Sequence, residues 1–292
     1  MQIAPRNLEI LKKVDTMIKK FIIVPTALII FSASITLSKE AKWILVKNAK
    51  KLKSIKAEKI TWKKDNAKMV RISEELNQKI KATTHDQPDN PVSPKKETLI
   101  KMSDSFYMDA YEVTIGQFRK FLQSSNYKPM KPIKWNEVYM YSPTDKHPMI
   151  YVSWHDASAY AKWAGKRLPT NKEWEFATRG GLIDKKFPWG NDKNLAREYA
   201  NYEGTGGKDN WDNSTAPVGS LKPNDYGLFD MSGNVSEWCQ NQSNNNHSTY
   251  VLRGGSWCNF TAPLRVTYQL YPDPHHRSYI VGFRCVVGLE SP

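Results

Sequence analysis

The sequence predicts an α+β domain with few helices and many irregular loops. Two capping patterns indicate helix starts, one over Ser153–Asp156 and one beginning at Thr170, and Thr114 can cap a third helix. Gly165 and Gly180 should end two of these helices, because glycine readily adopts the left-handed conformation that closes a helix. The chain beyond them consists of short aromatic-rich segments separated by many turn residues, which is typical of short strands and loops.

The positive charge of the chain is concentrated near its N-terminus. The net charge is +14 over 292 residues, of which residues 1–84 carry +12 and the remainder only +2. A basic domain is typical of nucleic-acid binding, but here the charge belongs to an N-terminal arm and no nucleic-acid-reading motif accompanies it. We therefore expect no nucleic-acid partner.

An uncharged apolar segment follows a short basic N-terminus. Residues 1–20 are basic, whereas the seventeen residues of 21–37 contain no charged side chain. Such a segment is at the lower limit for crossing a bilayer, and it also fits the core of a signal peptide. We expect the membrane to be a partner through residues 21–37. The protein would then lie at the cell envelope with its domain on the periplasmic or extracellular side, or be secreted if this segment is cleaved.

The next segment, residues 38–84, is rich in lysine and contains neither glycine nor proline. This pattern predicts a basic helical stalk, with a helix over at least residues 68–80. Its lysines could contact anionic lipid head groups, or they could simply be solvated. Prolines then mark residues 85–97 as a linker, so the folded domain is predicted to span residues 98–292. The apolar residues at helical spacing are Met69, Ile72, Leu76 and Ile80.

The most informative stretch runs from Tyr226 to Trp257. Its first half contains two carboxylates, Asp230 and Glu237, on either side of a glycine turn. Carboxylate and carbonyl oxygens on a sharply turning chain are the ligands that Ca²⁺ prefers. Its second half is a short β-run followed by the sequence R-G-G-S-W, which pairs a tight turn with an aromatic residue.

Several motifs together resemble the formylglycine-generating enzyme family, also called the sulfatase-modifying factor family. G-L-F-D-M-S-G-N-V-S-E-W begins at Gly227, R-G-G-S-W begins at Arg253, and G-F-R begins at Gly282. Further motifs in the family's order extend the resemblance over about residues 98–288. The resemblance implies a C-type-lectin-like fold within the α+β class, and members that commonly enter a secretory route.

The same resemblance implies two structural calcium sites. It carries one site onto the side chains of Asp230 and Glu237 and the carbonyls of Gly233 and Val235. These acids could instead cap turns and pair with lysines. A calcium ion held by oxygen ligands would brace the loops and perform no redox chemistry. The other site is carried onto Asn201, Tyr202, Asp209 and Trp211.

The resemblance fails at the catalytic cysteine pair. Active members bind copper(I) through two cysteines, the first three residues beyond the serine of R-G-G-S and the second five residues further on. The corresponding residues here are Asn259 and Leu264, while Cys258 lies one position early. A lone thiolate cannot supply the two-sulfur site that copper(I) favours, so copper is not expected. Cys258 and the retained Ser256 are the remaining catalytic candidates.

The pairing of the three cysteines is open at this stage. Cys285 matches a structural cysteine of the family, but the position of its partner is Ala161 in this chain. A bridge between Cys258 and Cys285, or between Cys239 and either of them, could replace the missing one. A free buried thiol that packs as a small apolar side chain is the alternative.

The expected function is a non-catalytic one. We expect a membrane-anchored or exported binding or scaffolding module, or an accessory maturation factor of the envelope, with a protein or glycan partner and a place in a membrane complex. The alternative is a formylglycine-generating-type oxidase that modifies a partner protein's cysteine. Aromatic and histidine side chains could form the recognition surface, or could equally belong to the core. They are Trp257, Phe260, Tyr268, Tyr271, His275 and Tyr279.

Overall fold

The computed structural model describes residues 43–74, 104–204, 210–242 and 249–288. The chain divides into two compact units, Met1–Glu40 and Ala41–Pro292, and the described residues all belong to the second unit. The predicted N-terminal segments within residues 1–37 and the predicted linker 85–97 lie outside the described residues. Among the residues that are described, no helix has both the length and the apolar character needed to cross a bilayer.

The three predicted helices are confirmed, and their ends follow from the capping residues. The side chains of Thr114, Ser153 and Thr170 each accept a hydrogen bond from the backbone N–H three residues later. Two of the helices end at Gly165 and Gly180, which have φ angles of 72° and 58°. The three helices are α3 (Ile115–Ser124), α5 (Trp154–Ala164) and α6 (Asn171–Arg179). The shorter helical segments are α4 (Trp135–Tyr141), α7 (Ala196–Tyr199), η2 (Ala49–Ser54), η3 (Lys193–Leu195) and η4 (Ala262–Leu264).

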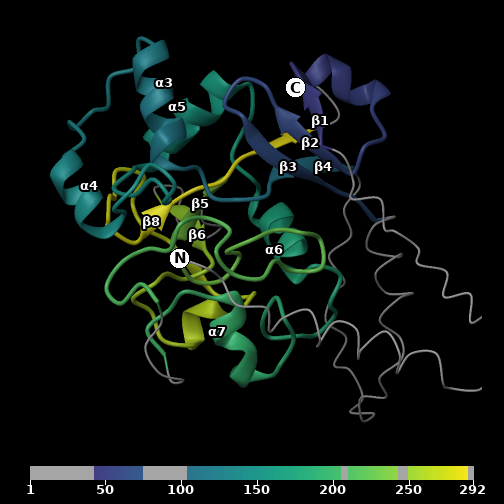
Figure 1. The fold of residues 1–292 in the computed structure, drawn as a ribbon, viewed down its shortest axis with the longest axis vertical. Coiled ribbons are helices and arrows are strands. Elements are labelled where there is room, and N and C mark those ends of the chain that lie inside the picture. Colours follow the sequence, from purple (N-terminus) through teal and green to yellow (C-terminus); the bar gives the residue numbers. More distant parts are fainter. Residues whose placement is uncertain (1–42, 75–103, 205–209, 243–248, 289–292) are drawn as a thin grey trace, which may run out of the picture. The chain divides into compact units, whose positions relative to one another are not determined.

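The strands form two sheets, which confirms the α+β class (Figure 1). In the first sheet the order is β1-β2-β3-β4-β9, with β1 parallel to β2 and the other neighbours antiparallel. In the second the order is β7-β6-β5-β8, with β8 parallel to β5. The strands of the first sheet are β1 (Ile44–Val46), β2 (Lys59–Trp62), β3 (Ala67–Ile72), β4 (Phe106–Asp109) and β9 (Val286–Gly288). Those of the second are β5 (Ser236–Gln242), β6 (Tyr250–Arg253), β7 (Gln269–Leu270) and β8 (Val281–Gly282).

The prediction of a basic helical stalk was wrong. Part of the segment 38–84 forms β1, η2, β2 and β3, so the folded domain begins well before residue 98. The predicted helix over 68–80 is replaced up to Ile72 by strand β3. Residues 73 and 74 follow the strand, and residues 75–80 lie outside the described residues. The spacing of Met69 and Ile72 fits a helix by chance, whereas Thr61, Val70 and Ile72 are β-branched and favour strands. Asn66, at a φ of 61°, lies in the tight turn between β2 and β3.

A buried ion cluster holds these N-terminal strands to the rest of the domain. The Lys166 ammonium lies 2.9 Å from Asp65, in the β2–β3 turn, and 2.7 Å from Asp109, at the end of β4. The Tyr160 hydroxyl also donates to Asp65, at 2.8 Å. Burial raises the pKa of Asp109 to about 6, although the Lys166 charge opposes this shift. Strands β2 and β3 are therefore part of the core structure.

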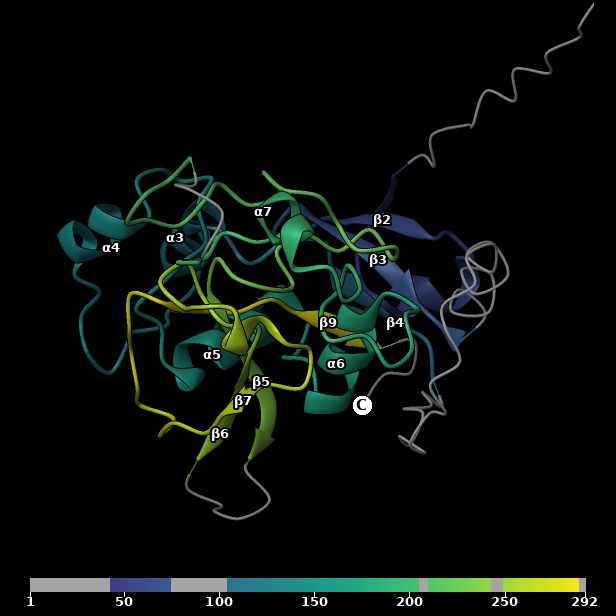
Figure 2. The same cartoon turned by 90° about the horizontal axis from the view of Figure 1, so that it is seen from below.

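The second sheet lies between helices α5 and α6. Helices α5 and α6 contact the β5–β6 pair, and the two views show them on opposite sides of it (Figures 1 and 2). On the α5 side, Trp238 of β5 packs in the largest apolar cluster with Tyr160 and Phe283. On the α6 side, Trp174 packs with residues of β3 and β4. The motif residues of β5, β6 and β8 are consequently held between two apolar layers.

Candidate functional site

The second predicted calcium site lies on a tight turn over residues 230–234. Asp230, Gly233 and Asn234 have left-handed φ angles of 58°, 82° and 59°. A Cβ atom at Gly233 would lie 2.3 Å from the carbonyl oxygen of Asn201, so only glycine fits there. The backbone N–H of Asn234 donates to the same carbonyl at 2.8 Å. The turn therefore holds the loops of the two predicted calcium sites against each other.

One predicted ligand of this site, Glu237, is engaged in an internal ion pair. Its carboxylate accepts hydrogen bonds from the Arg284 guanidinium at 2.7 to 3.0 Å, and from the indole N–H of Trp174 at 2.9 Å. Arg284 also donates to backbone carbonyls of the β4 end and of Phe229. Both charged side chains are at most 1% exposed. Because each oxygen of Glu237 already accepts a hydrogen bond, this side chain is a poor cation ligand as it stands.

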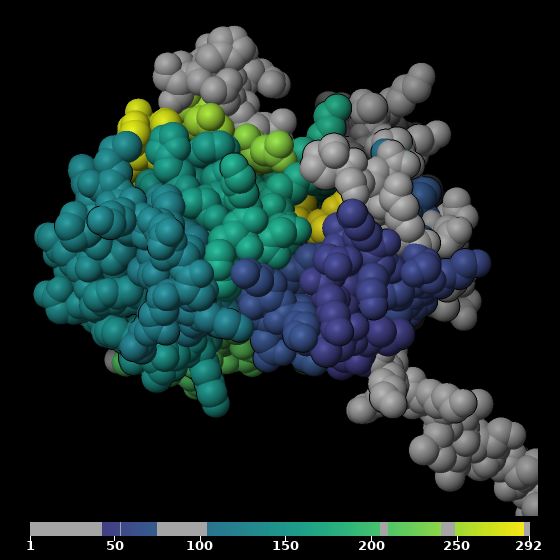
Figure 3. All heavy atoms as spheres, turned by 90° about the horizontal axis from the view of Figure 1, so that it is seen from above, coloured from purple at the N-terminus to yellow at the C-terminus, as the bar shows by residue number. Residues whose placement is uncertain are grey.

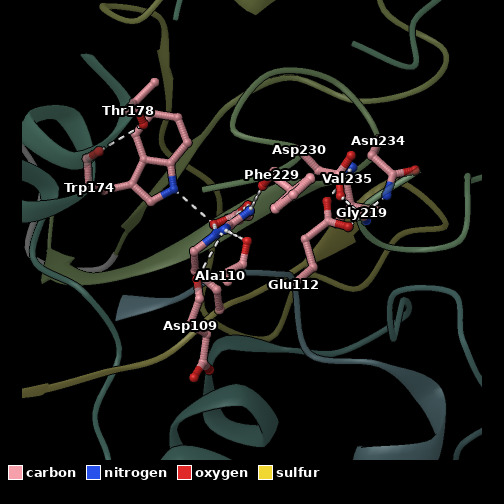
Figure 4. Close-up of polar contacts among 12 residues, drawn as sticks. Asp109, Ala110, Glu112, Trp174, Thr178, Gly219, Phe229, Asp230, Asn234 and Val235 are labelled. Carbon is pink, nitrogen blue, oxygen red and sulfur yellow. Dashed lines mark hydrogen bonds and ion pairs between the residues drawn. The ribbon is translucent and has the colours of Figure 1, made fainter. Parts of the chain in front are cut away.

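Glu112, which the sequence analysis missed, completes a buried carboxylate cluster (Figure 4). Its carboxylate accepts hydrogen bonds from the Asn234 amide at 2.6 Å and from the Val235 N–H at 3.2 Å. Asp230 accepts the Gly219 N–H at 2.7 Å through one oxygen. Its other oxygen, Oδ1, is buried and has no hydrogen-bond partner within the described part of the chain.

The cluster contains more negative than positive charge. Glu112, Asp230 and Glu237 are all at most 2% exposed. Among the described residues, Arg284 is the one buried cation that interacts with all three. Burial, followed by the charges of Asp230 and Glu237, raises the pKa of Glu112 well above its usual range. Burial also raises the pKa of Asp230 to about 6. The surplus carboxylates must therefore be protonated, or they must be balanced by a further cation.

A hard cation would fit part of this cluster. The free oxygen of Asp230 matches the preference of Ca²⁺ for carboxylate oxygens. A bound ion would also balance the surplus charge of Glu112, whose own two oxygens already accept hydrogen bonds. Three acidic, histidine or cysteine side chains do not converge closely enough anywhere in the described ranges to hold a metal by themselves. Backbone carbonyls, such as the predicted ones of Gly233 and Val235, would have to supply the other ligands.

The first predicted calcium site is only partly described. Asn201 is buried, and its amide donates to Asn234 at 3.3 Å, while its own Oδ1 is without a partner among the described residues. The carbonyl of Tyr202 accepts a hydrogen bond from Arg197, and that of Trp211 accepts one from Ser214. Asp209 lies outside the described residues.

The three cysteines are all described, and none forms a disulfide. Cys239 and Cys285 are fully buried, and burial raises the pKa of both thiols above the usual range. Cys258 is half-buried, with its sulfur 3.7 Å from the hydroxyl of Ser256. The bridges considered from the sequence are therefore absent, and Cys258 is the one thiol that reaches the surface.

The residues at the family's two copper-binding positions have other roles here. The side chain of Asn259 accepts a hydrogen bond from the Ser256 hydroxyl at 2.9 Å. Leu264 is fully buried in an apolar cluster with Phe187, Tyr202 and two alanines. A Cβ at Gly255 would lie 3.0 Å from the Pro263 carbonyl, so the segment carrying Leu264 packs directly on the R-G-G-S turn.

An aromatic cluster surrounds Cys258. Tyr279 stacks on Tyr141 at a centroid distance of 4.8 Å, and Trp257 lies 5.7 Å from Tyr279. The neighbouring Cys258, followed by burial, raises the pKa of the Tyr279 phenol. Tyr151, 6.4 Å from Tyr279, has a φ of 55°, and such strain in a bulky residue is often found at functional sites. We call these four aromatic residues with Cys258 the thiol–aromatic cluster.

The structure separates the other predicted recognition residues from this cluster. His275 is exposed and lies 4.8 Å from the ring of His155, next to Trp154. Phe260 and Tyr271 are 68% and 48% exposed. Tyr268 is half-buried, and its carbonyl accepts a hydrogen bond from Arg253. The predicted surface is thus divided, and only Trp257 and Tyr279 lie in the cluster with Cys258. Trp257 is 6% exposed, so it belongs to the core and not to the surface.

Comparison with known families agrees with this architecture. A family model described as a sulfatase-modifying factor enzyme 1-like domain matches residues 57–289. The chain belongs to this family. The match begins two residues before β2, in agreement with the early start of the domain.

Relatives of this sulfatase-modifying factor domain include one protein named as an enzyme and one named as an inactive enzyme. The formylglycine-generating enzyme of Bos taurus is 32% identical over 247 residues, covering 62% of this chain and 65% of the relative. The protein named inactive C-alpha-formylglycine-generating enzyme 2, also from Bos taurus, is 42% identical over 156 residues, covering 50% of this chain and 52% of the relative. The chain therefore spans less than two thirds of either relative.

Solved structures support the fold of the sulfatase-modifying factor domain. PvdO from Pseudomonas aeruginosa superposes with a TM-score of 0.58 at 22% identity, covering 78% of this chain and 97% of that one. At this identity the likeness establishes the fold alone.

Three residues of the site, Glu112, Tyr141 and Tyr151, were not predicted from the sequence, because the sequence patterns around them in this sulfatase-modifying factor domain are weak. Glu112 follows a strand in D-A-Y-E-V-T, but its contact with a turn more than 120 residues away has no local pattern. Tyr141 and Tyr151 come from the end of α4 and from a loop, and only the fold brings them to Cys258.

Proposed function

We propose that this chain is a non-catalytic member of the sulfatase-modifying factor family that binds a partner through its thiol–aromatic cluster. One observation carries this proposal: the second copper-binding position is Leu264, fully buried among apolar side chains. Cys239 and Cys285 are buried in other clusters, so no second cysteine thiol is available beside Cys258. Copper(I) chemistry of the family's type needs two soft sulfur ligands.

The thiol–aromatic cluster supports a recognition role. Three of its tyrosines are half-buried, so their rings combine apolar area with exposed edges. Phe260, 68% exposed, follows the cluster closely in the chain and extends the apolar surface. Aromatic faces of this kind bind extended protein segments or the faces of sugar rings. A protein partner or a glycan at the cell envelope is accordingly the proposed ligand.

Two further parts of the proposal concern the context of this module. The uncharged segment 21–37 would attach the chain to the membrane, or direct its export, as part of an envelope complex. Calcium bound at Asp230 would neutralise the surplus buried charge and brace the turn over residues 230–234. Both roles are structural and leave the chemistry of Cys258 untouched.

The decisive experiment measures copper(I) binding and oxidation in parallel. The full chain is titrated with copper(I) under a competing chelator, and then incubated with oxygen and a cysteine-containing peptide. We expect weak copper binding that is equal in wild type and Cys258→Ser, and a peptide of unchanged mass. Tight one-to-one binding lost in Cys258→Ser, together with conversion of the peptide cysteine to an aldehyde, would instead establish the oxidase.

The binding role is tested by site-specific cross-linking. A photoreactive phenylalanine analogue replaces Phe260 in the full chain, and a matched variant carries it at Met130, which is 72% exposed. We expect cross-linking to an envelope protein or glycan from the Phe260 position only, and its loss when Tyr279→Ala is added. Equal cross-linking from both positions would contradict recognition at this cluster.

A further inference from the structure

Strands β1, β2 and β3 present a face that the proposed recognition role does not use. Alternation along the strands and the pairing of Leu45 with Thr61 place one set of side chains on the same side of the sheet. We call it the lysine–tryptophan face: Trp43, Leu45, Lys59, Thr61 and Lys68. Figure 3 shows the segment that carries it, in purple and blue, gathered over one part of the surface.

The contacts within the lysine–tryptophan face fix two ammonium groups above an aromatic ring. The Lys68 ammonium lies 4.9 Å from the centroid of Trp43 and donates to the Thr61 hydroxyl at 2.9 Å. The Lys59 ammonium lies 5.8 Å from the same ring. These cation–π contacts orient the lysines without neutralising their charge.

The charge around the face is almost entirely positive. Residues 43–72 contain nine lysines and one arginine, but only two acids. One of these acids, Asp65, is buried against Lys166 and leaves no negative charge at the surface. The other is Glu58, which is exposed. A phosphate-rich partner would therefore meet little repulsion here.

Exposed apolar side chains interrupt this positive surface at the edge of the sheet. Leu45 is 57% exposed and Ile44 is 44% exposed, both on β1, which has a neighbour on one side only. Solvated lysine surfaces need no such residues, whereas membrane interfaces accommodate tryptophan, leucine and lysine together.

We propose that the lysine–tryptophan face binds the anionic lipid head groups of a bilayer. The lysines would pair with lipid phosphates, while Leu45 would enter the interfacial region. Trp43 is partly buried against the core cluster that contains Val70, and its ring would hold the lysine ammonium groups in place. The uncharged segment ends at Leu37, and the six residues to Trp43 span at most about 20 Å when fully extended. A segment held in the membrane would thus keep the face close to the head groups. This inference rests on the proposed membrane attachment, and its test separates the two.

The test uses the full chain and vesicles of two compositions. Partition is measured onto neutral phosphatidylcholine vesicles and onto vesicles with about one third phosphatidylglycerol, at low and at high salt. The apolar segment contributes to both, so the ratio of the two partition coefficients isolates the effect of charge. We expect the wild type to prefer the anionic vesicles, with a preference that falls at high salt.

Matched variants locate the effect. Each lysine close to an anionic surface contributes about fivefold, so Lys59→Gln with Lys68→Gln should lower the anionic preference at least tenfold. The control, Lys128→Gln with Lys172→Gln, removes the same charge from exposed positions elsewhere and should change the ratio little. Leu45→Ser should weaken partition onto both compositions. A thermal melt of each variant confirms that the fold is retained.

Three outcomes would overturn the inference. Equal ratios in the wild type and the Lys59/Lys68 variant would remove the face from lipid binding while leaving membrane attachment intact. Absence of binding to either vesicle type would overturn the attachment as well. Displacement of the vesicles by a single-stranded oligonucleotide, through the same two lysines and at a lower concentration than soluble head-group phosphate requires, would assign the face to nucleic acid.

Discussion

The buried carboxylate cluster and the thiol–aromatic cluster lie on neighbouring motifs, but they differ in burial and in how many contacts hold each residue in place. In the carboxylate cluster, Glu112, Glu237 and Arg284 are at most 1% exposed and contact each other or backbone groups from four separate segments. In the thiol–aromatic cluster, Cys258 and Tyr279 are half-buried and adjoin open loops.

The difference explains which part of the family pattern survives in this chain. Loss of Arg284 would leave the buried carboxylates without their cation, so this residue is needed for a stable fold. Asn259 and Leu264, by contrast, replace the copper-binding thiols without leaving a buried polar group unpaired. The buried ionic residues that stabilise the fold are consequently retained, while the residues at positions 259 and 264 can change.

The largest expected effect is loss of the fold on removing the N-terminal strands. A chain that begins at residue 98 lacks β1, β2 and β3 and exposes the buried edge of β4. It also leaves Lys166 without Asp65. We expect this truncation to lack a cooperative thermal transition by circular dichroism. A cooperative transition similar to that of the full chain would show that these strands are dispensable.

The next largest effect is expected at the centre of the carboxylate cluster. Arg284→Met should lower the free energy of unfolding by about 3–5 kcal/mol, because it leaves buried carboxylates without their cation. The control Arg119→Met breaks an exposed ion pair with Asp145 and should cost at most about 1 kcal/mol. Urea unfolding of both variants gives the two values, and similar losses would contradict the special role of Arg284.

A smaller effect is expected from pH, and calcium should modify it. The pKa of Asp230 is raised to about 6 in the folded state. Such a group stabilises the fold fully below its unfolded pKa, and this stability is lost as the pH rises through about 6. The raised pKa values of Glu112 and Asp109 act in the same direction. Without calcium, the free energy of unfolding should therefore fall by roughly 2–3 kcal/mol between about pH 4 and pH 7 because of Asp230 alone.

Added calcium should restore this stability at neutral pH, and Asp230→Asn should abolish both the calcium response and much of the pH dependence. Asp145→Asn, at a carboxylate that is 52% exposed, is the matched control. Urea unfolding across pH with and without calcium provides the measurement. A calcium response that survives in Asp230→Asn would place the ion elsewhere.

The smallest stability effect is expected in the thiol–aromatic cluster. Tyr279→Phe removes the phenol next to Cys258 but keeps the ring stacked on Tyr141, so the free energy of unfolding should change by less than about 1 kcal/mol. The rate at which Cys258 reacts with a thiol reagent should change instead. An unfolding cost as large as that of Arg284→Met would place this cluster in the core of the fold.

The sequence predicted some parts of this molecule well because their signals are local. The capping residues Thr114, Ser153 and Thr170 and the helix-ending glycines lie within a few residues of the helices they delimit. The turn at Gly233 was also recognisable, since its glycine and its acids are close in the chain. The prediction failed where helical and strand spacing overlap, as at Met69 and Ile72.

Other parts could not be predicted because distant segments form them. Glu112 meets Asn234 across more than 120 residues, and Asp65 meets Lys166 across 101. The sequence predicted Glu237 as a cation ligand. The ion pair between Glu237 and Arg284 could not be predicted, because it depends on strand β8 lying beside β5. A pattern of acids therefore indicated a charged cluster without showing which acid Arg284 neutralises.

We conclude that this chain keeps the family fold but lacks the two copper-binding cysteines. This conclusion is tested most directly by measuring the copper(I) affinity of a variant in which both cysteines are restored. The double substitution Asn259→Cys and Leu264→Cys is titrated against the wild type under a competing chelator, with intact folding checked by thermal melting. If only the thiols were lost, the variant gains one tightly bound copper(I) and the wild type has none. Tight binding of one copper(I) by the wild type, abolished in Cys258→Ala, would contradict this and assign redox chemistry to the natural chain.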